Sequence, residues 1–121
     1  MVQLIKHDLE ERTAVFGENI IDLCKKLQPS IINNPIIVQL IRSSTSVGAN
    51  YMEANGASSR RDFANKIFIC KKEAQETKHW LRMLSKAVED KEVTLKLRLL
   101  WQECQELTLI FQKITNSLRS N

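Results

Sequence analysis

The sequence has few residues that break helices. Its 121 residues include only three glycines and two prolines, so turn signals between short strands are scarce. This scarcity favours long helices and predicts an all-α protein. No apolar run approaches the roughly 18 residues needed to cross a bilayer, and residues 1–6 lack a charged segment followed by an apolar one. We therefore expect a cytoplasmic protein without a membrane partner.

Cysteines and catalytic motifs are scarce as well. Cys24, Cys70 and Cys104 are odd in number and widely spaced among apolar neighbours. This pattern predicts small buried side chains, and it argues against disulfides, a zinc site or a nucleophilic thiol. The P-loop, the glycine-rich dinucleotide turn and the Gly-x-Ser-x-Gly elbow are absent. The sequence therefore predicts no enzyme, no catalytic residue and no cofactor.

Apolar residues recur at helical spacing in four segments, at about 8–28, 35–55, 60–88 and 91–119. Each segment has a candidate N-cap at its start, namely Asp8, Asn34, Ser59 and Asp90. Short connections place consecutive helices side by side and antiparallel. We therefore expect residues 1–121 to form one antiparallel up-down-up-down four-helix bundle. Trp80 and Trp101 could fill either the core or a subunit interface, and we expect them in the core.

Polar and small residues mark the second predicted helix. Arg42, Ser46, Asn50 and Glu53 fall within about 80° of arc at helical spacing and form one polar stripe. Small residues beside the stripe leave little side-chain volume, so a neighbouring helix can approach closely; they are Ser44, Val47, Gly48 and Ala49. The hydroxyl run 43–46 forms helices poorly by itself, so packing must hold this helix.

The stretch from Arg42 to Leu84 resembles a known family. The residues that carry the resemblance are Arg42 through Ser46, Val47-Gly48-Ala49-Asn50-Tyr51, Glu53-Ala54, Ser59, Asp62-Phe63, Lys66, Lys72-Glu73-Ala74, Glu76-Thr77 and Trp80-Leu81. They are similar to the signature of the bacterial four helix bundle proteins, also called 23S rRNA intervening sequence proteins. The resemblance implies an up-down bundle that assembles as a cyclic homopentamer. A distant relative is the accessory protein of diversity-generating retroelements, which works with a reverse transcriptase and nucleic acid.

We interpret the matching polar residues as a structural network, made of Arg42, Ser46, Asn50, Glu53, Lys66, Glu73 and Glu76. Charges on packed helix faces need partners, because an unpaired buried charge is costly. The alternative is a ligand or metal pocket built from the same groups. Glu76 and His79 have the Glu-x-x-His spacing of ferritin-like dimetal sites, but a second such pair and two further glutamates are missing. The sequence therefore predicts no metal.

Positive charge is concentrated in the second half of the chain. Residues 1–59 carry five basic and six acidic residues, whereas residues 60–121 carry thirteen and eight. In the third predicted helix, basic residues share one side. The candidate nucleic-acid-binding residues are Arg60, Arg61, Lys71, Lys78, Arg82 and Lys86. Aromatic residues do not interleave with them, so we expect contacts to the phosphate backbone without sequence specificity.

Two functions fit these observations. The first is a non-enzymatic homo-oligomer, a homopentamer by resemblance, that binds RNA or DNA non-specifically through the third helix. A ring of five such helices would add their potentials into one broad positive surface. The second is an assembly or adaptor protein that binds a protein partner through exposed apolar positions and has no nucleic-acid role. Steep salt dependence of nucleic-acid binding would identify the first.

Overall fold

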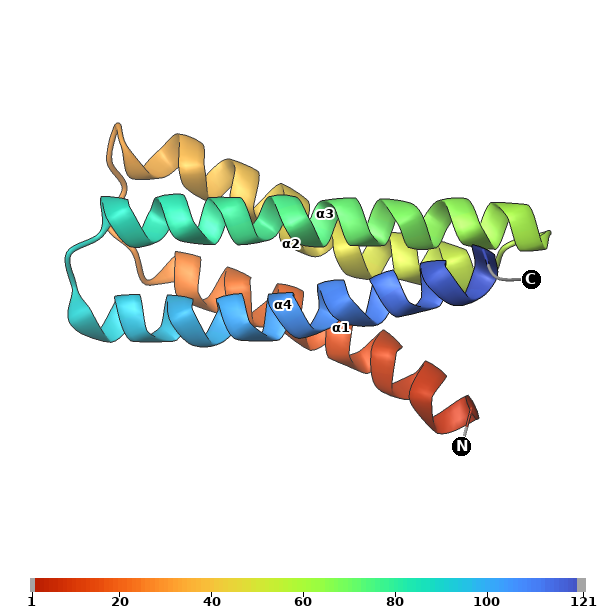
Figure 1. The fold of residues 1–121 in the computed structure, drawn as a ribbon. Coiled ribbons are helices and arrows are strands. Elements are labelled where there is room, and N and C mark those ends of the chain that lie inside the picture. The colour runs from red at the N-terminus through yellow and green to blue at the C-terminus, as the bar shows by residue number, and fades with distance from the viewer. Residues whose placement is uncertain (1, 120–121) are drawn as a thin grey trace.

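The structure is a computed structural model that describes the backbone of residues 2–119 and the side chains of residues 9–119; residues 1, 120 and 121 of the predicted domain lie outside this range. It contains four helices, α1 (Val2–Lys25), α2 (Asn33–Asn55), α3 (Arg60–Ala87) and α4 (Lys91–Arg119). Each helix packs against the next, and α1 also contacts α4 and closes the bundle. The colours of Figure 1 show that α1 and α3 run in one direction and α2 and α4 in the other, so the helices run up and down in turn. The predicted all-α four-helix bundle is confirmed.

The starts of α3 and α4 are fixed by local side-chain caps. The Ser59 hydroxyl accepts a hydrogen bond from the Asp62 backbone N–H at 3.0 Å. The Asp90 carboxylate accepts hydrogen bonds from the N–H groups of Glu92 and Val93 at 2.8 and 3.1 Å. These bonds satisfy N–H groups that have no partner within the helix. Both predicted caps are confirmed, and both helices lie within one residue of their predicted bounds.

The predicted bounds of α1 were wrong at both ends. The helix begins at Val2, so Asp8 lies inside it and is not its N-cap. It ends at Lys25, three residues before the predicted end. At that end, the N–H of Leu27 bonds to the carbonyl of Cys24 at 3.2 Å, an i to i−3 bond that tightens the last turn into 3₁₀ geometry.

Asn34, the predicted N-cap of α2, lies inside the helix as its second residue. The residue at the N-cap position, Ile32, makes no side-chain cap bond, but the Ser30 hydroxyl accepts a hydrogen bond from the Asn33 N–H at 2.8 Å. The Asn34 side-chain oxygen bonds back to the Ser30 N–H at 3.2 Å. The two reciprocal bonds resemble a capping box. Asn34 was predicted as the N-cap, but here it provides the side chain that bonds back to the preceding turn. The predicted end of α2 at Asn55 is confirmed.

All four helices contribute large side chains to the core. The largest fully buried apolar ones are Phe16, Ile20, Leu40, Val47, Ile67, Leu81, Leu84, Leu97, Leu107 and Phe111. Each contributes about 1.5 to 3 kcal/mol through burial. The three cysteines are buried among them, as predicted. Burial raises the pKa of Cys24 to about 11 and those of Cys70 and Cys104 to about 12, so these thiols stay protonated at neutral pH.

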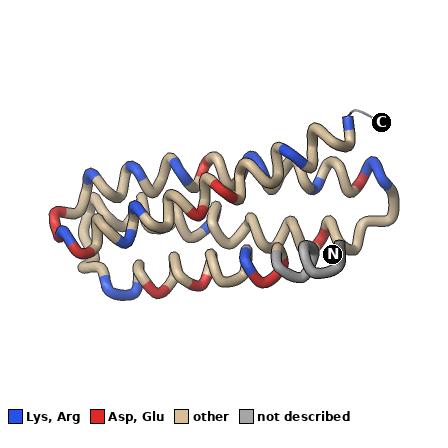
Figure 2. The backbone as a smooth tube through the Cα atoms, turned by 60° about the horizontal axis from the view of Figure 1, so that its bottom comes forward, with Lys and Arg blue, Asp and Glu red and all other residues tan. Residues whose placement is uncertain are grey.

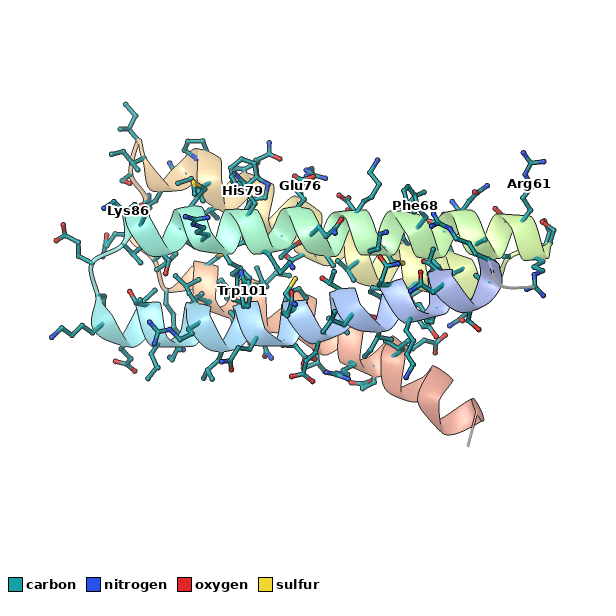
Figure 3. The ribbon with its side chains drawn as sticks, viewed as in Figure 1. Arg61, Phe68, Glu76, His79, Lys86 and Trp101 are labelled. Atoms are coloured by element: carbon teal, nitrogen blue, oxygen red, sulfur yellow. The ribbon has the colours of Figure 1, made fainter. Side chains whose placement is uncertain are left out.

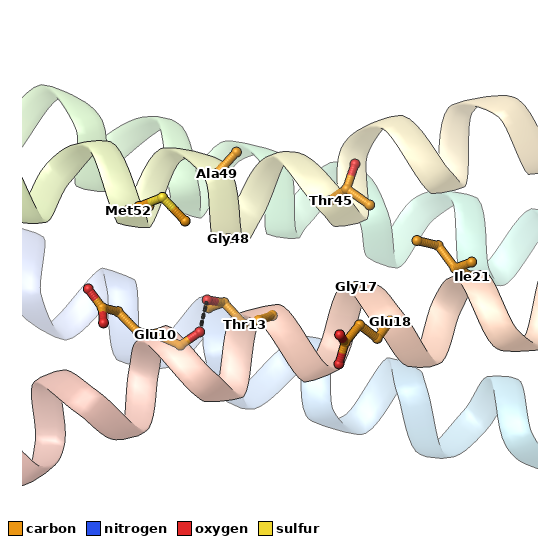
Figure 4. Close-up of a pocket in the computed structure, with 10 residues that line it drawn as sticks. Glu10, Thr13, Gly17, Glu18, Ile21, Thr45, Gly48, Ala49 and Met52 are labelled. Atoms are coloured by element: carbon orange, nitrogen blue, oxygen red, sulfur yellow. Dashed lines mark hydrogen bonds between the residues drawn. The ribbon is translucent and has the colours of Figure 1, made fainter.

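Helices α1 and α2 approach closely where glycines face side chains of the other helix. A Cβ atom at Gly48 would lie 3.4 Å from the Thr13 hydroxyl, and one at Gly17 would lie 3.6 Å from the Thr45 methyl group. The predicted close approach through Gly48 is therefore present, against α1. An open groove of about 580 Å³ follows this contact, with Ile21 and Met52 along it (Figure 4).

The core placement predicted for the two tryptophans was wrong for Trp101. Its side chain is 39% exposed, whereas Trp80 is half-buried. The helical period places Trp101 at the edge of the apolar face of α4, between Leu97 and Cys104, which are both buried. Trp101 therefore lies where α3 and α4 meet at the surface (Figure 3).

Candidate nucleic-acid interface

Helix α3 carries all of the excess positive charge of the chain. It contains eight basic and three acidic residues, whereas α1 between Leu9 and Lys25 contains two basic and four acidic ones. Figure 2 shows basic positions recurring along the length of α3, while acidic positions follow α1 on the opposite side of the bundle. Whether each of these cations is neutralised depends on whether a carboxylate lies opposite it.

Two of the predicted lysines reach across to α4 and bond to neutral amides. Lys71 Nζ donates to Gln112 Oε1 at 3.0 Å, and Lys78 Nζ donates to Gln105 Oε1 at 2.5 Å. Each bond orients the ammonium group without cancelling its charge. We call this surface the α3–α4 seam; it comprises Lys71, Lys78 and Arg82 of α3 and Arg98, Trp101, Gln105 and Gln112 of α4.

The other predicted binding residues are distributed around this seam. Arg82 lines a hollow with Arg98 and Trp101 and belongs to the seam. Arg60 donates to the Leu118 carbonyl at 3.5 Å near the end of α4, and Arg61 points away from α4 (Figure 3). Lys86 lies further round α3, in a hollow with Ile36 and Trp80. The structure therefore gathers Lys71, Lys78 and Arg82, and it places Arg61 and Lys86 elsewhere.

No carboxylate lies within ion-pair distance of the α3 cations in the seam, among the residues that the structure describes. The nearby α4 carboxylates point toward α1 instead. Arg12 bonds to Glu103 at 2.8 and 2.9 Å and to Glu106 at 3.0 Å. These bonds raise the pKa of Arg12, with the Glu103 hydrogen bond as the largest cause. The positive charge of the seam is thus left uncompensated.

The predicted polar network lies on the other edge of α3, and it divides into two parts. In the first, Arg42 pairs with Glu73 at 3.2 Å and with Glu76, while the Trp80 Nε1–H donates to Glu76 at 2.8 Å. In the second, Lys66 pairs with Glu53 at 2.7 Å. We call these residues the α2–α3 rim; they are Arg42, Glu53, Lys66, Glu73, Glu76 and Trp80.

The remaining two predicted members stay within their own helix: the Asn50 side chain donates to the Ser46 carbonyl at 2.8 Å. The charges of the rim also lie closer to solvent than expected, since the Arg42 side chain is 44% exposed. On the core side of these charges, a buried polar contact is formed by hydroxyl groups. The Thr77 hydroxyl donates to the Glu73 carbonyl at 2.7 Å and lies 2.9 Å from the Ser43 hydroxyl. The inward face is therefore neutral.

Ion pairing shifts the pKa values of the rim. The pKa of Arg42 is raised, chiefly by its hydrogen bond to Glu76. The pKa of Glu76 is lowered, first by the hydrogen bond from Trp80 and then by Arg42. The pKa of Lys66 is raised by its hydrogen bond to Glu53. All three shifts favour the charged forms, so the rim pairs persist at neutral pH.

The expected lack of aromatic residues beside the basic residues was wrong. The Lys78 ammonium lies 5.5 Å from the ring centroid of Trp101, and Lys71 and Lys72 lie 5.0 and 5.8 Å from that of Phe68. Trp101 was missed because it belongs to another helix. Pairing the antiparallel helices would have found it, because Lys71–Gln112 and Lys78–Gln105 have the same sum of residue numbers, and that sum pairs Arg82 with Trp101.

Catalytic and metal-binding alternatives gain nothing from the geometry. Glu76 is held by Arg42 and Trp80, and His79 packs edge-on against the Trp80 ring at 4.9 Å. Among the described residues, no three histidine, cysteine or carboxylate side chains are placed to hold a metal ion. In the serine run, Ser43 and Ser44 are buried and contact carbonyls of their own helix. Within 2–119, no helix is long and apolar enough to span a membrane.

Comparisons with known proteins agree with this fold. The family model of the 23S rRNA-intervening sequence protein matches residues 6–107. The chain is also similar to a crystal structure from Bacteroides thetaiotaomicron, described as a protein of unknown function from the S23 ribosomal protein family. The two are 29% identical, with a TM-score of 0.76 over 92% of this chain and 97% of that one. No curated protein matches the sequence.

Proposed function

The chain belongs to the 23S rRNA-intervening sequence protein family, and from that premise we propose that it is a non-enzymatic homo-oligomer that binds nucleic acid through the α3–α4 seam. The bound feature would be the phosphate backbone, which any RNA or DNA offers regardless of sequence. Such a partner would place the protein in the cytoplasm.

One observation carries the proposal: Lys71 and Lys78 are oriented by glutamines and not by carboxylates. A lysine paired with a carboxylate must give up that pair before it binds a phosphate. A lysine held by an amide keeps its full charge, because the amide is neutral and the bond replaces only a bond to water. The seam thus offers oriented cations at little electrostatic cost.

The homo-oligomer, a pentamer as the resemblance implies, is supported by the groove between α1 and α2. Met52 in this groove is 70% exposed, and Ile21 also leaves part of its side chain in water. Glu10 and Glu18 stand at its border. We assign the groove to a second copy of this chain, because α3 residues outside the seam, such as Arg61 and Lys86, can offer positive charge to that acidic border. Head-to-tail contacts of this kind close into a ring when the rotation between neighbouring copies closes on itself, as a cyclic pentamer requires.

Binding is tested by titrating the purified, nuclease-treated protein against labelled duplex DNA and structured RNA at about 50 and 200 mM salt. If roughly four cations of each chain contact phosphates, affinity should fall by about 100-fold between these concentrations. Lys78→Glu combined with Arg82→Glu should abolish binding while the far-ultraviolet circular dichroism stays unchanged. The matched control is Lys25→Glu with Lys26→Glu, which removes the same charge from exposed positions on and just after α1.

Each outcome of the titration decides between the two candidate functions. Absence of binding at the lower salt concentration would refute the nucleic-acid role and leave an adaptor for a protein partner. Equal loss of binding in the seam variant and in the control would show that net charge matters and that the seam does not. Loss in the seam variant alone supports the proposal.

Assembly is tested separately by light scattering. The wild-type protein should have the mass of an oligomer, and Met52→Glu should shift it to the monomer, because a carboxylate would be buried beside Glu10 and Glu18. Leu109→Glu on α4 is the matched control, since Leu109 is also largely exposed. A monomeric wild-type protein, or dissociation only in the control, would contradict the assignment of the groove.

A further inference from the structure

Trp101 is the large aromatic side chain that the fold leaves at the α3–α4 seam. It is 39% exposed, although the buried residues Leu97 and Cys104 flank it on the same helix. A tryptophan ring offers a flat, polarisable face, and its removal from water is strongly favourable. The exposed position therefore leaves part of this ring available to a planar partner.

The groups around the ring are cations and a small hollow. The Lys78 ammonium lies 5.5 Å from the ring centroid and is held in place by Gln105. A hollow of about 200 Å³ adjoins the ring, and Arg82 of α3 and Arg98 of α4 line it together with Ser85. One aromatic face thus stands among three positive charges. This volume is below the several hundred Å³ typical of drug-sized ligands, so it suits one flat group attached to a longer chain.

Cations around an aromatic face match the chemistry of a nucleotide. The phosphates are negative and attract lysine and arginine, while the base is flat and stacks on an indole. In a duplex, each base is stacked between its neighbours, so its face is hidden. Only an unpaired base can place its face against Trp101.

We propose that Trp101, with Arg82 and Arg98, forms a stacking site for one unpaired base of a single-stranded nucleic acid. The inference rests on the proposed function, and it adds a preference that phosphate contacts alone do not give. Phosphate contacts attract both single strands and duplexes. Stacking adds affinity only for the single strand and tolerates every base, because every base has a π-face.

The test uses the fluorescence of Trp101 as a direct readout. Trp80→Phe leaves Trp101 as the one tryptophan of the sequence, and Trp80 contacts Glu76 on the other edge of α3. Titration of this variant with an oligothymidylate should quench its fluorescence, whereas a duplex with the same number of phosphates should bind with little quenching. Trp101→Leu in the otherwise wild-type chain should lower single-strand affinity by about tenfold and leave duplex affinity within about twofold.

The outcomes separate this inference from the function on which it rests. If the wild-type protein binds neither ligand, the proposed function and the stacking site both fail. If it binds both, and Trp101→Leu changes neither affinity, the function stands and the stacking site is refuted. If Trp101→Leu changes the mass in light scattering, Trp101 belongs to a contact between subunits and the stacking site is likewise refuted.

Discussion

Basic side chains at the two edges of α3 have different partners. At the α2–α3 rim, Arg42 and Lys66 meet the carboxylates of Glu76 and Glu53. At the α3–α4 seam, Lys71 and Lys78 meet the amides of glutamines. Both arrangements hold the side chains in defined positions, but only the first cancels their charge.

This difference suggests separate roles for the two edges. A neutralised, hydrogen-bonded pair can fix the register of two helices, although a solvent-exposed pair contributes little net stability. An oriented but uncompensated cation contributes even less to the fold. It produces a positive potential that an anionic partner can use. We therefore expect changes at the rim to affect stability, and changes at the seam to affect binding.

The largest expected effect comes from giving the seam the chemistry of the rim. Gln105→Glu with Gln112→Glu would place a carboxylate beside Lys78 and Lys71. Each neutralised lysine should lower nucleic-acid affinity by about tenfold at 50 mM salt, so the double variant should lose about 100-fold. The slope of log affinity against log salt concentration should also become shallower, by the amount expected for the loss of about two phosphate contacts. Titration at several salt concentrations measures both quantities.

The control adds the same charge at the rim. Gln39 accepts a hydrogen bond from Arg42 at 3.0 Å, so Gln39→Glu is the counterpart of Gln105→Glu. Affinity in the Gln39→Glu variant should stay within about twofold of the wild-type value, because the rim cation is already neutralised. If it falls as far as in Gln105→Glu, overall charge governs binding and the contrast between the edges is wrong.

A second pair of variants removes one cation from each edge. Lys78→Gln should weaken binding by about tenfold at 50 mM salt and change the free energy of unfolding very little. Arg42→Gln should leave binding unchanged and lower the free energy of unfolding by at most about 1 kcal/mol, since the Arg42 side chain is 44% exposed and water screens its ion pairs. Urea unfolding and nucleic-acid titration of both variants measure the contrast. The reverse pattern would exchange the roles of the two edges.

The caps and the core of this bundle could be predicted from the sequence because both depend on local spacing. Ser59 and Asp90 each precede a helix whose N–H groups they can reach, and core residues such as Ile67 and Leu81 follow the helical period. The start of α1 could not be found in this way. Asp8 has the form of a cap, but the helix continues through it to Val2.

The two edges of α3 were harder to predict, because their character depends on which residues of other helices lie opposite. The spacing of Lys71 and Lys78 placed them on one side of α3, but it gave no information about their glutamine partners on α4. The exposure of Trp101 depends on the same register. Conversely, the charge of Arg42 was predicted to lie on a packed helix face, whereas a long side chain can extend its charge to the solvent at the edge of the contact.

A third prediction concerns the neutral contact beneath the rim. Thr77→Val keeps the volume of the side chain but removes the hydroxyl that bonds to Ser43 and to the Glu73 carbonyl. We expect the free energy of unfolding to fall by about 1 kcal/mol, because a buried hydrogen bond is lost. This corresponds to a shift in Tm of about 4 °C. Nucleic-acid affinity should not change, and a loss of binding in this folded variant would show that the two edges of α3 are coupled.

The smallest expected effect is a pH dependence that, of the two edges of α3, only the rim should show. Because the pKa of Glu76 is lowered in the folded protein, its contribution to stability is present above the unfolded pKa of about 4.5 and is lost as the pH falls through the lower folded value. The Glu76 side chain is 37% exposed, so we expect this contribution to the free energy of unfolding to be less than about 1 kcal/mol.

Urea unfolding at pH 6 and pH 3.5 tests this expectation. The difference in the free energy of unfolding between wild type and Glu76→Gln should shrink at the lower pH. The difference between wild type and Lys78→Gln should stay constant, since no carboxylate pairs with Lys78 in the described chain. A pH-dependent difference for Lys78→Gln would mean that a carboxylate neutralises the seam after all.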